Sequence, residues 1–219
     1  MQRIKPSVIL FDLDGTLVDS APDLAGAMHR LQRRRDLPAT PYAILRPRAS
    51  AGARGLIAAA FGLAPDDAGY EKLRIEFLDE YAANIALDSR LFDGIAAMLH
   101  GLEQQQIGWG IVTNKASRFT DALVPQMPLS KARCVVSGDT TPHTKPHPAP
   151  LIEAARRAGA DPAYCWYVGD DIRDIEAGRA AGMTTVSVGW GYGNHLSPVA
   201  WQADIHIETP VDLLRCIAC

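Results

Sequence analysis

Strand-like and helix-like segments alternate along the chain from about Gly94 onward, after a first apolar run at Val8–Phe11. Such alternation predicts a parallel sheet with helices on both faces, which is a doubly wound α/β fold. Open sheets of this kind bind ligands at the carboxyl ends of their strands. The predicted helices are 95–105, 117–124, 149–158, 172–181 and 210–216, and the predicted strands are 107–113, 133–136, 164–168, 184–188 and 204–207.

The stretch from about residue 19 to residue 90 breaks this alternation, because it lacks strand-like runs. Its apolar residues repeat every four positions at Leu73, Phe77, Tyr81 and Ile85, which predicts one packed helical stripe. A second apolar stretch, 55–64, predicts a buried helix. The sequence thus predicts a helical cap domain at 19–91, inserted into a core made of 1–18 and 92–219, with linkers near 16–22 and 89–94. A cap that closes over a site excludes water from it.

The first predicted strand ends in two carboxylates, Asp12 and Asp14, followed by Gly15. Side chains at positions i and i+2 of a strand point to the same face, so the two carboxylates converge. Paired carboxylates repel each other and need a cation or a shared proton. The pair therefore suits a nucleophile and an acid/base around a hard metal ion. Taken alone, the pattern also fits a strand that ends in an acidic turn.

Two later segments offer groups that hold phosphate. Thr113 ends a predicted strand and can donate to a phosphate oxygen, although Thr113 or Asn114 can equally cap a helix that starts near Ala116. Lys145 lies in a proline-stiffened loop, where a fixed ammonium suits the charge of a phosphomonoester. The alternative for Lys145 is an ordinary exposed loop lysine.

The segment Gly169–Asp174 supplies another group of carboxylates after a predicted strand. Capping of the following helix accounts for Asp171 and partly for Asp174. It does not account for Asp170, which lies where a metal ion needs a carboxylate. We interpret His143 and His147 as loop histidines beside a phosphate pocket and not as metal ligands.

In this order the motifs resemble those of the haloacid dehalogenase superfamily of phosphatases, and the resemblance covers nearly all of the chain from about Ser7. It implies a Rossmann-like core with a helical cap. It also implies that Asp12 is the nucleophile that forms an aspartyl-phosphate, and that Asp14 is the general acid and then the base. Thr113, Asn114 and Lys145 would bind the phosphate.

The same resemblance implies Mg²⁺ as the cofactor. Asp12, Asp170 and the backbone carbonyl of Asp14 would bind the ion, and Asp174 would lie beside these ligands. Asp14 argues against a dehalogenase, since a halide leaves without a proton. Only one lysine, Lys72, lies in the predicted cap, which argues against cleavage of phosphonates by a cap lysine. A non-catalytic binding module would not require these carboxylates and Lys145 together.

Within the superfamily the chain resembles the phosphoglycolate phosphatase branch most, through the cap loop 50–56 and the run 169–178. Segments 53–55, 73–78 and 112–115 also resemble phosphatases of N-acetylmuramic acid 6-phosphate, which is the alternative. A sugar phosphomutase is a further alternative. Arg54 and Arg48 can clamp a substrate carboxylate, or they can be surface arginines. Both candidate substrates carry a carboxylate, so such a clamp does not separate them.

The partner that the resemblance implies is a small phosphate monoester, and the composition argues against two other kinds of partner. The formal net charge of −3 gives no support for binding nucleic acid, which usually needs a basic face. No apolar run reaches the roughly 18 residues of a membrane span, and Asp12 interrupts the first apolar run, so we expect a cytoplasmic protein without a signal peptide. A monomer and a homodimer both stay open. We expect Cys134 and Cys165 to be buried within strands, while Cys216 and Cys219 lack the second pair that a zinc site needs.

Overall fold

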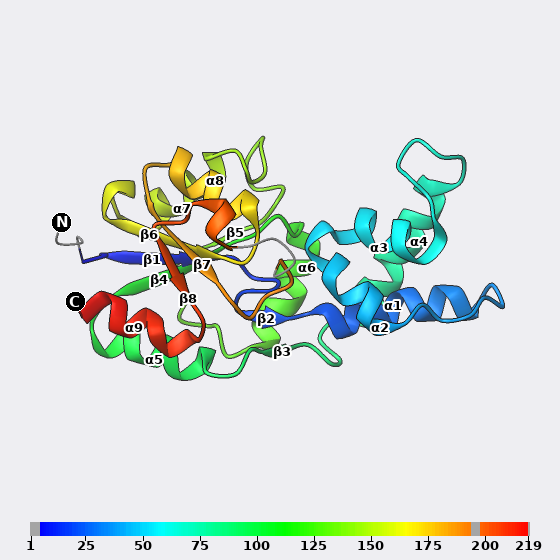
Figure 1. Ribbon diagram of the computed structural model, residues 1–219, viewed down its shortest axis with the longest axis horizontal. Coiled ribbons are helices and arrows are strands. Elements are labelled where there is room, and N and C mark those ends of the chain that lie inside the picture. The colour runs from blue at the N-terminus through cyan, green and yellow to red at the C-terminus, as the bar shows by residue number, and fades with distance from the viewer. Residues whose placement is uncertain (1–4, 194–197, 219) are drawn as a thin grey trace. The chain divides into compact units, whose positions relative to one another are not determined.

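The computed structural model describes residues 5–193 and 198–218, which fold as two units (Figure 1). One unit combines the chain up to Val18 with the chain from Leu91 onward, and the other is Asp19–Arg90. The first is an α/β unit and the second is helical. The predicted fold class, a doubly wound parallel sheet with an inserted helical domain, is confirmed.

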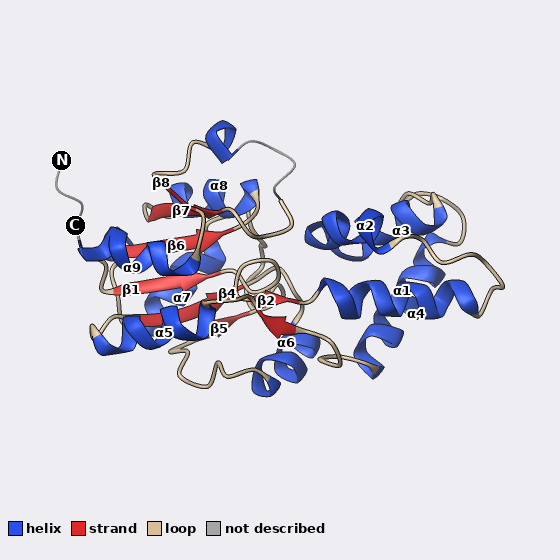
Figure 2. Cartoon of the chain, turned by 60° about the horizontal axis from the view of Figure 1, so that its bottom comes forward, coloured by secondary structure: helices blue, strands red, loops and turns tan. Residues whose placement is uncertain are grey.

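The α/β unit is built on a six-stranded sheet in the order β5-β4-β1-β6-β7-β8, and all of its strand pairs are parallel (Figure 2). Strand β1 lies in the middle, where the order along the sheet reverses. Parallel sheets bind ligands at such a switch point. The strands are β1 (Val8–Phe11), β4 (Gly108–Val112), β5 (Val135–Val136), β6 (Cys165–Gly169), β7 (Thr184–Val188) and β8 (Ile205–Ile207).

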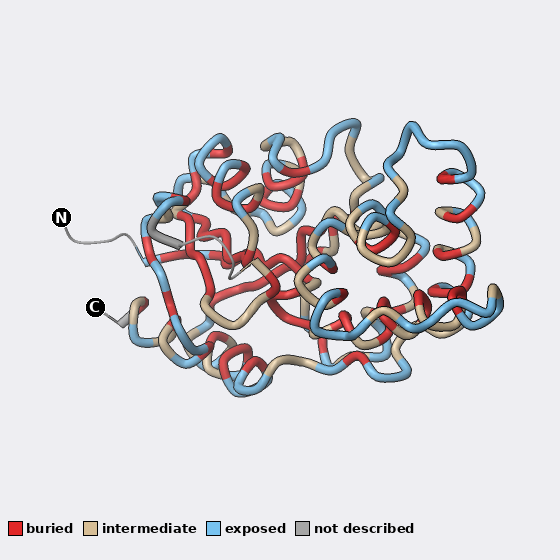
Figure 3. The backbone as a smooth tube through the Cα atoms, turned by 45° about the vertical axis from the view of Figure 1, so that its right-hand side comes forward, coloured by how far each residue is buried: buried red, intermediate tan, exposed pale blue. Residues whose placement is uncertain are grey.

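Helices cover both faces of this sheet. Helices α7 and α8 lie on one face, and α5 and α9 lie on the other (Figure 1). Strands β1, β4 and β6 are therefore buried along their whole length, as their continuous apolar sequences predict (Figure 3). The helices of this unit are α5 (Ile95–Gln104), α6 (Ser117–Leu123), α7 (Ala149–Ala158), α8 (Ile172–Ala180) and α9 (Pro210–Ala218), with 3₁₀ turns η2 (Val124–Gln126), η3 (Pro162–Tyr164) and η4 (Pro198–Trp201).

Three strand predictions were too long, and the one at 107–113 exceeds β4 by one residue at each end. The strand predicted at 133–136 is β5, which pairs only at Val135 and Val136 with its one neighbour β4. Cys134 therefore precedes the strand, although it is buried as expected. The strand predicted at 204–207 begins one residue later, because the Asp204 carboxylate instead accepts hydrogen bonds from the backbone and hydroxyl of Thr185.

The helical unit contains α1 (Ala21–Arg33), α2 (Tyr42–Leu45), the 3₁₀ turn η1 (Arg46–Ala51), α3 (Gly52–Phe61) and α4 (Tyr70–Ala83). The predicted stripe is buried at Leu73, Phe77 and Tyr81, but α4 ends before Ile85. The predicted helix at 55–64 is present as α3, but it begins and ends earlier in the chain and is less buried than predicted. Helix α3 stops at Phe61 before a left-handed glycine, and it is buried only at Leu56 and Ile57.

The entry and exit of the helical unit are tied together at Asp23 in the first turn of α1. The buried Asp23 carboxylate accepts hydrogen bonds from the backbone N–H groups of Asp88 at 2.8 Å and Ser89 at 3.0 Å. The segments that join the two units, β2 (Val18–Asp19) and β3 (Arg90–Leu91), form a two-stranded sheet.

Within the described ranges, no helix combines the length and the apolar character needed to span a bilayer.

Candidate active site

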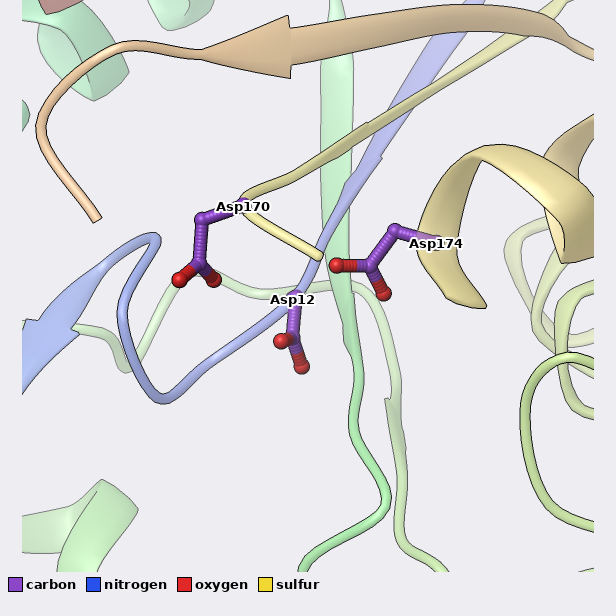
Figure 4. A group of neighbouring side chains, drawn as sticks. All are labelled: Asp12, Asp170 and Asp174. Carbon is purple, nitrogen blue, oxygen red and sulfur yellow. The ribbon is translucent and has the colours of Figure 1, made fainter. Parts of the chain in front are cut away.

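Three carboxylates meet at the carboxyl end of the central strands (Figure 4). Asp12 follows β1, and Asp170 follows β6. These strands pair in parallel with Phe11 opposite Val168, so their ends bring the two residues to the same edge. Asp174 joins them from the first turn of α8. One oxygen from each of the three carboxylates lies within 4.8 Å of the others.

Burial makes this group electrostatically costly, since all three carboxylates are buried. Burial raises the pKa of Asp12 to about 7, against the opposing charge of Lys145. Burial and the neighbouring charges of Asp12 and Asp174 raise the pKa of Asp170 well above its usual value. Carboxylates that destabilise one another in this way are suited to a site that receives a cation.

Lys145 is the buried cation of this group, so the interpretation as an exposed loop lysine is wrong. Its Nζ lies 2.8 Å from Asp12 Oδ1, 2.7 Å from Asp174 Oδ1 and 2.8 Å from the Tyr167 hydroxyl. Burial alone would lower the pKa of Lys145, but the charges of Asp12 and Asp174 raise it above its usual value. The ammonium also donates to the backbone carbonyl of Val112 at 3.2 Å.

Asn114 holds the loop that carries Lys145. Its Nδ2 donates to the backbone carbonyl of Lys145 at 2.9 Å, and its Oδ1 accepts from the backbone N–H of Lys145 at 2.9 Å. These bonds take up the amide oxygen and one of its N–H groups. The structure therefore gives Asn114 a holding role in this loop, where the sequence predicted a contact with phosphate.

Thr113 is buried at the end of β4, and its hydroxyl accepts a hydrogen bond from the backbone N–H of Lys115 at 3.1 Å. The alternative that Thr113 or Asn114 caps the next helix is wrong. Helix α6 begins at Ser117, whose backbone N–H and hydroxyl donate to the Asp139 carboxylate, each at 2.8 Å. Thr113 thus stays at the carboxyl end of β4, where its backbone N–H donates to the Val136 carbonyl at 2.9 Å.

Asp170 is fixed by two donors and two close backbone approaches. The Thr16 hydroxyl donates to its Oδ1 at 3.0 Å, and the backbone N–H of Tyr192 donates to its Oδ2 at 2.7 Å. Gly15, at φ +89°, and Gly191 lie so close that a Cβ on either would overlap this carboxylate. The chain thus forms a cradle around Asp170 that side chains at these two positions would fill.

Asp171 and Asp174 do cap α8, as the capping interpretation predicts. Asp171 accepts from the backbone N–H of Arg173 at 3.0 Å, while Asp174 Oδ2 accepts from the backbone N–H of Asp171 at 3.0 Å. The other oxygen of Asp174 contacts Lys145 and the Tyr167 hydroxyl. Asp174 therefore joins the helix start to the buried ammonium.

Asp14 pairs with a residue that sequence reasoning missed. Lys115 Nζ lies 3.0 Å and 3.2 Å from the two oxygens of the Asp14 carboxylate. Thr16, Tyr167 and the backbone of Tyr192 were missed as well. The only signal in the sequence for Lys115 was its place directly after Thr113 and Asn114 at the end of a predicted strand.

The remaining sequence predictions lie outside this group. Arg48 on η1 and Arg54 on α3 are exposed residues of the helical unit. The rings of His143 and His147 stack with centroids 4.2 Å apart. Cys134, Cys165 and Cys216 are free thiols, while Cys219 lies outside the described residues.

The chain belongs to the haloacid dehalogenase-like hydrolases, since the model of that family matches residues 9–188. A phosphoglycolate phosphatase of Xanthomonas campestris pv. campestris is 46% identical over 212 residues, which cover 95% of each chain. An N-acetylmuramic acid 6-phosphate phosphatase of Pseudomonas putida is 40% identical over 211 residues, again 95% of each chain. The predicted family and the predicted enzyme class, a phosphoric monoester hydrolase, are confirmed.

Solved structures share the whole fold. A predicted phosphoglycolate phosphatase from Haemophilus somnus has a TM-score of 0.84 at 26% identity, covering 96% of this chain and 97% of its own. A haloacid dehalogenase-like family hydrolase from Streptococcus pneumoniae has a TM-score of 0.81 at 22% identity, covering 96% and 98%. The second likeness concerns the fold alone.

We predict that Tyr167→Phe lowers the free energy of unfolding by about 1–2 kcal/mol, because it removes a buried hydroxyl that accepts from Lys145 and donates to the Val112 carbonyl at 2.9 Å. Urea unfolding measures this loss. Tyr164→Phe is the matched control, since the exposed Tyr164 lies just before the same strand. Equal stability of Tyr167→Phe and the wild type would contradict the hydrogen bonding described for this hydroxyl.

Proposed function

We propose that this protein is a Mg²⁺-dependent phosphatase that acts through an aspartyl-phosphate on a small phosphorylated metabolite. The observation that carries the proposal is the meeting of Asp12, Asp170 and Lys145 at the carboxyl ends of β1 and β6. A carboxylate nucleophile, a carboxylate group able to hold a metal ion and a fixed ammonium are the parts that phosphoryl transfer requires.

The residues present fit Mg²⁺. The ion prefers oxygen ligands and is bound through one or two carboxylates together with substrate phosphate. Asp12, Asp170 and the backbone carbonyl of Asp14 would hold it, with Asp174 beside them. The pKa of Asp12 and the pKa of Asp170 are raised because negative charge is unfavourable at this place, and a bound cation would relieve that unfavourable interaction. When bound, the ion neutralises charge on the phosphoryl oxygens.

In the first step, an oxygen of the Asp12 carboxylate attacks phosphorus. The bond from phosphorus to the ester oxygen breaks, and its electron pair goes to that oxygen. Asp14 supplies the proton that the leaving oxygen takes up. Lys145 keeps Asp12 in place through their 2.8 Å contact, and Thr113 and Lys145 hold the phosphate.

In the second step, water replaces the leaving alcohol. Asp14 accepts a proton from the water as the water oxygen attacks phosphorus, and the bond between phosphorus and Asp12 breaks. Inorganic phosphate is released, and both carboxylates return to their starting state. Exclusion of other water by the helical unit acting as a cap is part of the same proposal.

The substrate proposed first is 2-phosphoglycolate, which the relatives at 46% identity support by name. N-Acetylmuramic acid 6-phosphate is the second candidate, supported by the relative at 40% identity. Both compounds are phosphomonoesters that carry a carboxylate. We propose that Arg54 and, to a smaller extent, Arg48 of the helical unit bind that carboxylate.

We predict that, with Mg²⁺ present, the purified protein releases inorganic phosphate and that Asp12→Asn abolishes the release, because an amide is a poor nucleophile. The assay compares 2-phosphoglycolate, N-acetylmuramic acid 6-phosphate and simple sugar phosphates. The physiological substrate is expected to exceed the others in kcat/KM by about a hundredfold or more, or roughly 2.7 kcal/mol of transition-state binding. Asp66→Asn, at an exposed aspartate of the helical unit, is the control and retains activity. Transfer of phosphate to a sugar without release of inorganic phosphate would overturn the proposal in favour of a phosphomutase.

We predict that Asp170→Asn raises Tm in EDTA by about 2–4 °C, the shift produced by roughly 1 kcal/mol at this chain length, because it removes one of the repelling buried charges. An asparagine can still accept from the Tyr192 N–H and donate to the Thr16 hydroxyl. Millimolar Mg²⁺ is expected to raise the Tm of the wild type but not of Asp170→Asn. Differential scanning calorimetry measures both effects.

The neighbouring Asp171→Asn serves as the control for the Mg²⁺ experiment. Asp171 caps α8 and is paired with Arg173 at 2.8 Å, so this variant loses stability yet keeps the Mg²⁺ response. A wild type whose Tm is indifferent to Mg²⁺, or an Asp170→Asn variant that still responds, would argue against the proposed metal ligands.

We predict that Arg54→Ala raises KM for a carboxylate-bearing substrate by about tenfold or more, as expected for the loss of a charge-assisted hydrogen bond. Steady-state kinetics with the preferred substrate measures the change. Arg156→Ala is the control, because Arg156 is an exposed arginine of α7 that pairs with Glu153, three residues earlier on the same helix. An unchanged KM would remove Arg54 from the substrate site.

A further inference from the structure

We propose that Lys115 is a positioning residue for Asp14, which orients the carboxylate that exchanges protons with the substrate. This inference rests on the proposed function, because it concerns the residue proposed there as acid and base. The resemblance and the motif spacing assign no role to Lys115. The structure places its ammonium directly against the Asp14 carboxylate.

The contact has the geometry of an orienting clamp. Lys115 Nζ lies 3.0 Å from Asp14 Oδ1 and 3.2 Å from Asp14 Oδ2, so it meets both oxygens almost equally. The Lys115 side chain is 7% exposed, and the Asp14 side chain is 17% exposed. A shielded contact to both oxygens restricts rotation of the carboxylate more than a single exposed contact does.

The backbone of Lys115 is itself held on two sides. Its N–H donates to the Thr113 hydroxyl at 3.1 Å, and its carbonyl accepts from the Gly138 N–H at 2.8 Å. The first bond ties it to the end of β4, and the second ties it to the loop after β5. The ammonium therefore projects from a fixed point close to the segment that follows β1 and contains Asp14, since β1 and β4 pair with Phe11 opposite Ile111.

The two lysines of the site contact different carboxylates. Lys145 forms ion pairs with Asp12 and Asp174 and donates to the Tyr167 hydroxyl and the Val112 carbonyl. Lys145 therefore orients the proposed nucleophile, and Lys115 orients the proposed acid and base. A buried ion pair by itself is weak evidence for a contribution to stability. The Lys115–Asp14 contact instead fits a role in orienting a reacting group.

Removing a residue that orients the general acid should slow the reaction most for substrates whose leaving group must be protonated. An alkoxide leaves from phosphorus with difficulty unless it is protonated. A p-nitrophenolate leaves readily without a proton. Loss of the clamp should therefore slow the release of an alkyl alcohol more than the release of p-nitrophenol. A purely structural role for Lys115 would affect both substrates alike.

The experiment measures kcat and KM of Lys115→Met and Lys115→Gln on an alkyl phosphomonoester and on p-nitrophenyl phosphate. We expect the ratio of the alkyl kcat to the aryl kcat to fall by about 10- to 100-fold, part of the 10²–10⁴-fold that general acid–base catalysis contributes. KM should change by less than about threefold. Each ratio comes from one protein sample, so a partly unfolded variant still reports it. Lys115→Arg should restore part of the alkyl activity.

The control variant is Lys131→Met, at an exposed lysine paired with Glu103, and it should leave the ratio unchanged. A double variant completes the test. Once Asp14→Asn has removed the acid, adding Lys115→Met should lower the alkyl kcat no further, because the two residues act as one unit.

Two outcomes would overturn the inference. An equal fall in kcat for both substrates would mean a structural role, and a rise in KM for both would mean that Lys115 binds phosphate. Each outcome differs from failure of the proposed function. In that case Asp12→Asn would retain activity on both substrates, whatever Lys115 does.

Discussion

The structure depends on one unfavourable interaction, the burial of three carboxylates around a single ammonium. Asp12, Asp170 and Asp174 face one another in a buried place, and the ammonium of Lys145 offsets part of their charge there. The surrounding groups serve to keep this arrangement in place. Asn114 fixes the Lys145 loop, Tyr167 takes one N–H of the ammonium, and Thr16 holds Asp170. Local strain of this kind is typical of functional sites.

The parts that the sequence predicted are those whose signal is local. Apolar runs ending in Asp12, Thr113 and Asp170 marked strand ends, and a parallel sheet necessarily brings such ends to one edge. The order of these motifs then supported the family. The limits of β5 were not predictable in the same way, because a short edge strand is defined by its single neighbour and not by its own residues. Helix α3 was misjudged because apolar content alone does not say which side of a helix is covered.

The contacts that were missed have no local signal at all. Lys115 lies just after β4 and Tyr167 lies inside β6, and neither segment differs in sequence from other strands and strand ends. The register of β1 between β4 and β6 gives both residues their partners. Asn114 lies beside Lys145 in the structure. Its amide turned toward the Lys145 backbone because a loop this close to a buried ion pair needs its own polar groups satisfied. The role of such a side chain depends on which of several neighbours it contacts. The three-dimensional structure is needed to assign that role.

The central place of β1 has a consequence for the newly made chain. The ribosome makes β1 first, but its neighbours β4 and β6 are made much later. Strand β1 therefore cannot form its sheet hydrogen bonds until those strands have been made. The contact between Asp14 and Lys115 spans 101 residues, and the contact between Thr16 and Asp170 spans 154. Long loops must close before these contacts form, which slows folding. A growing chain thus lacks Asp170 and Asp174 until β6 and the start of α8 have been made, so the carboxylate group assembles only late in synthesis.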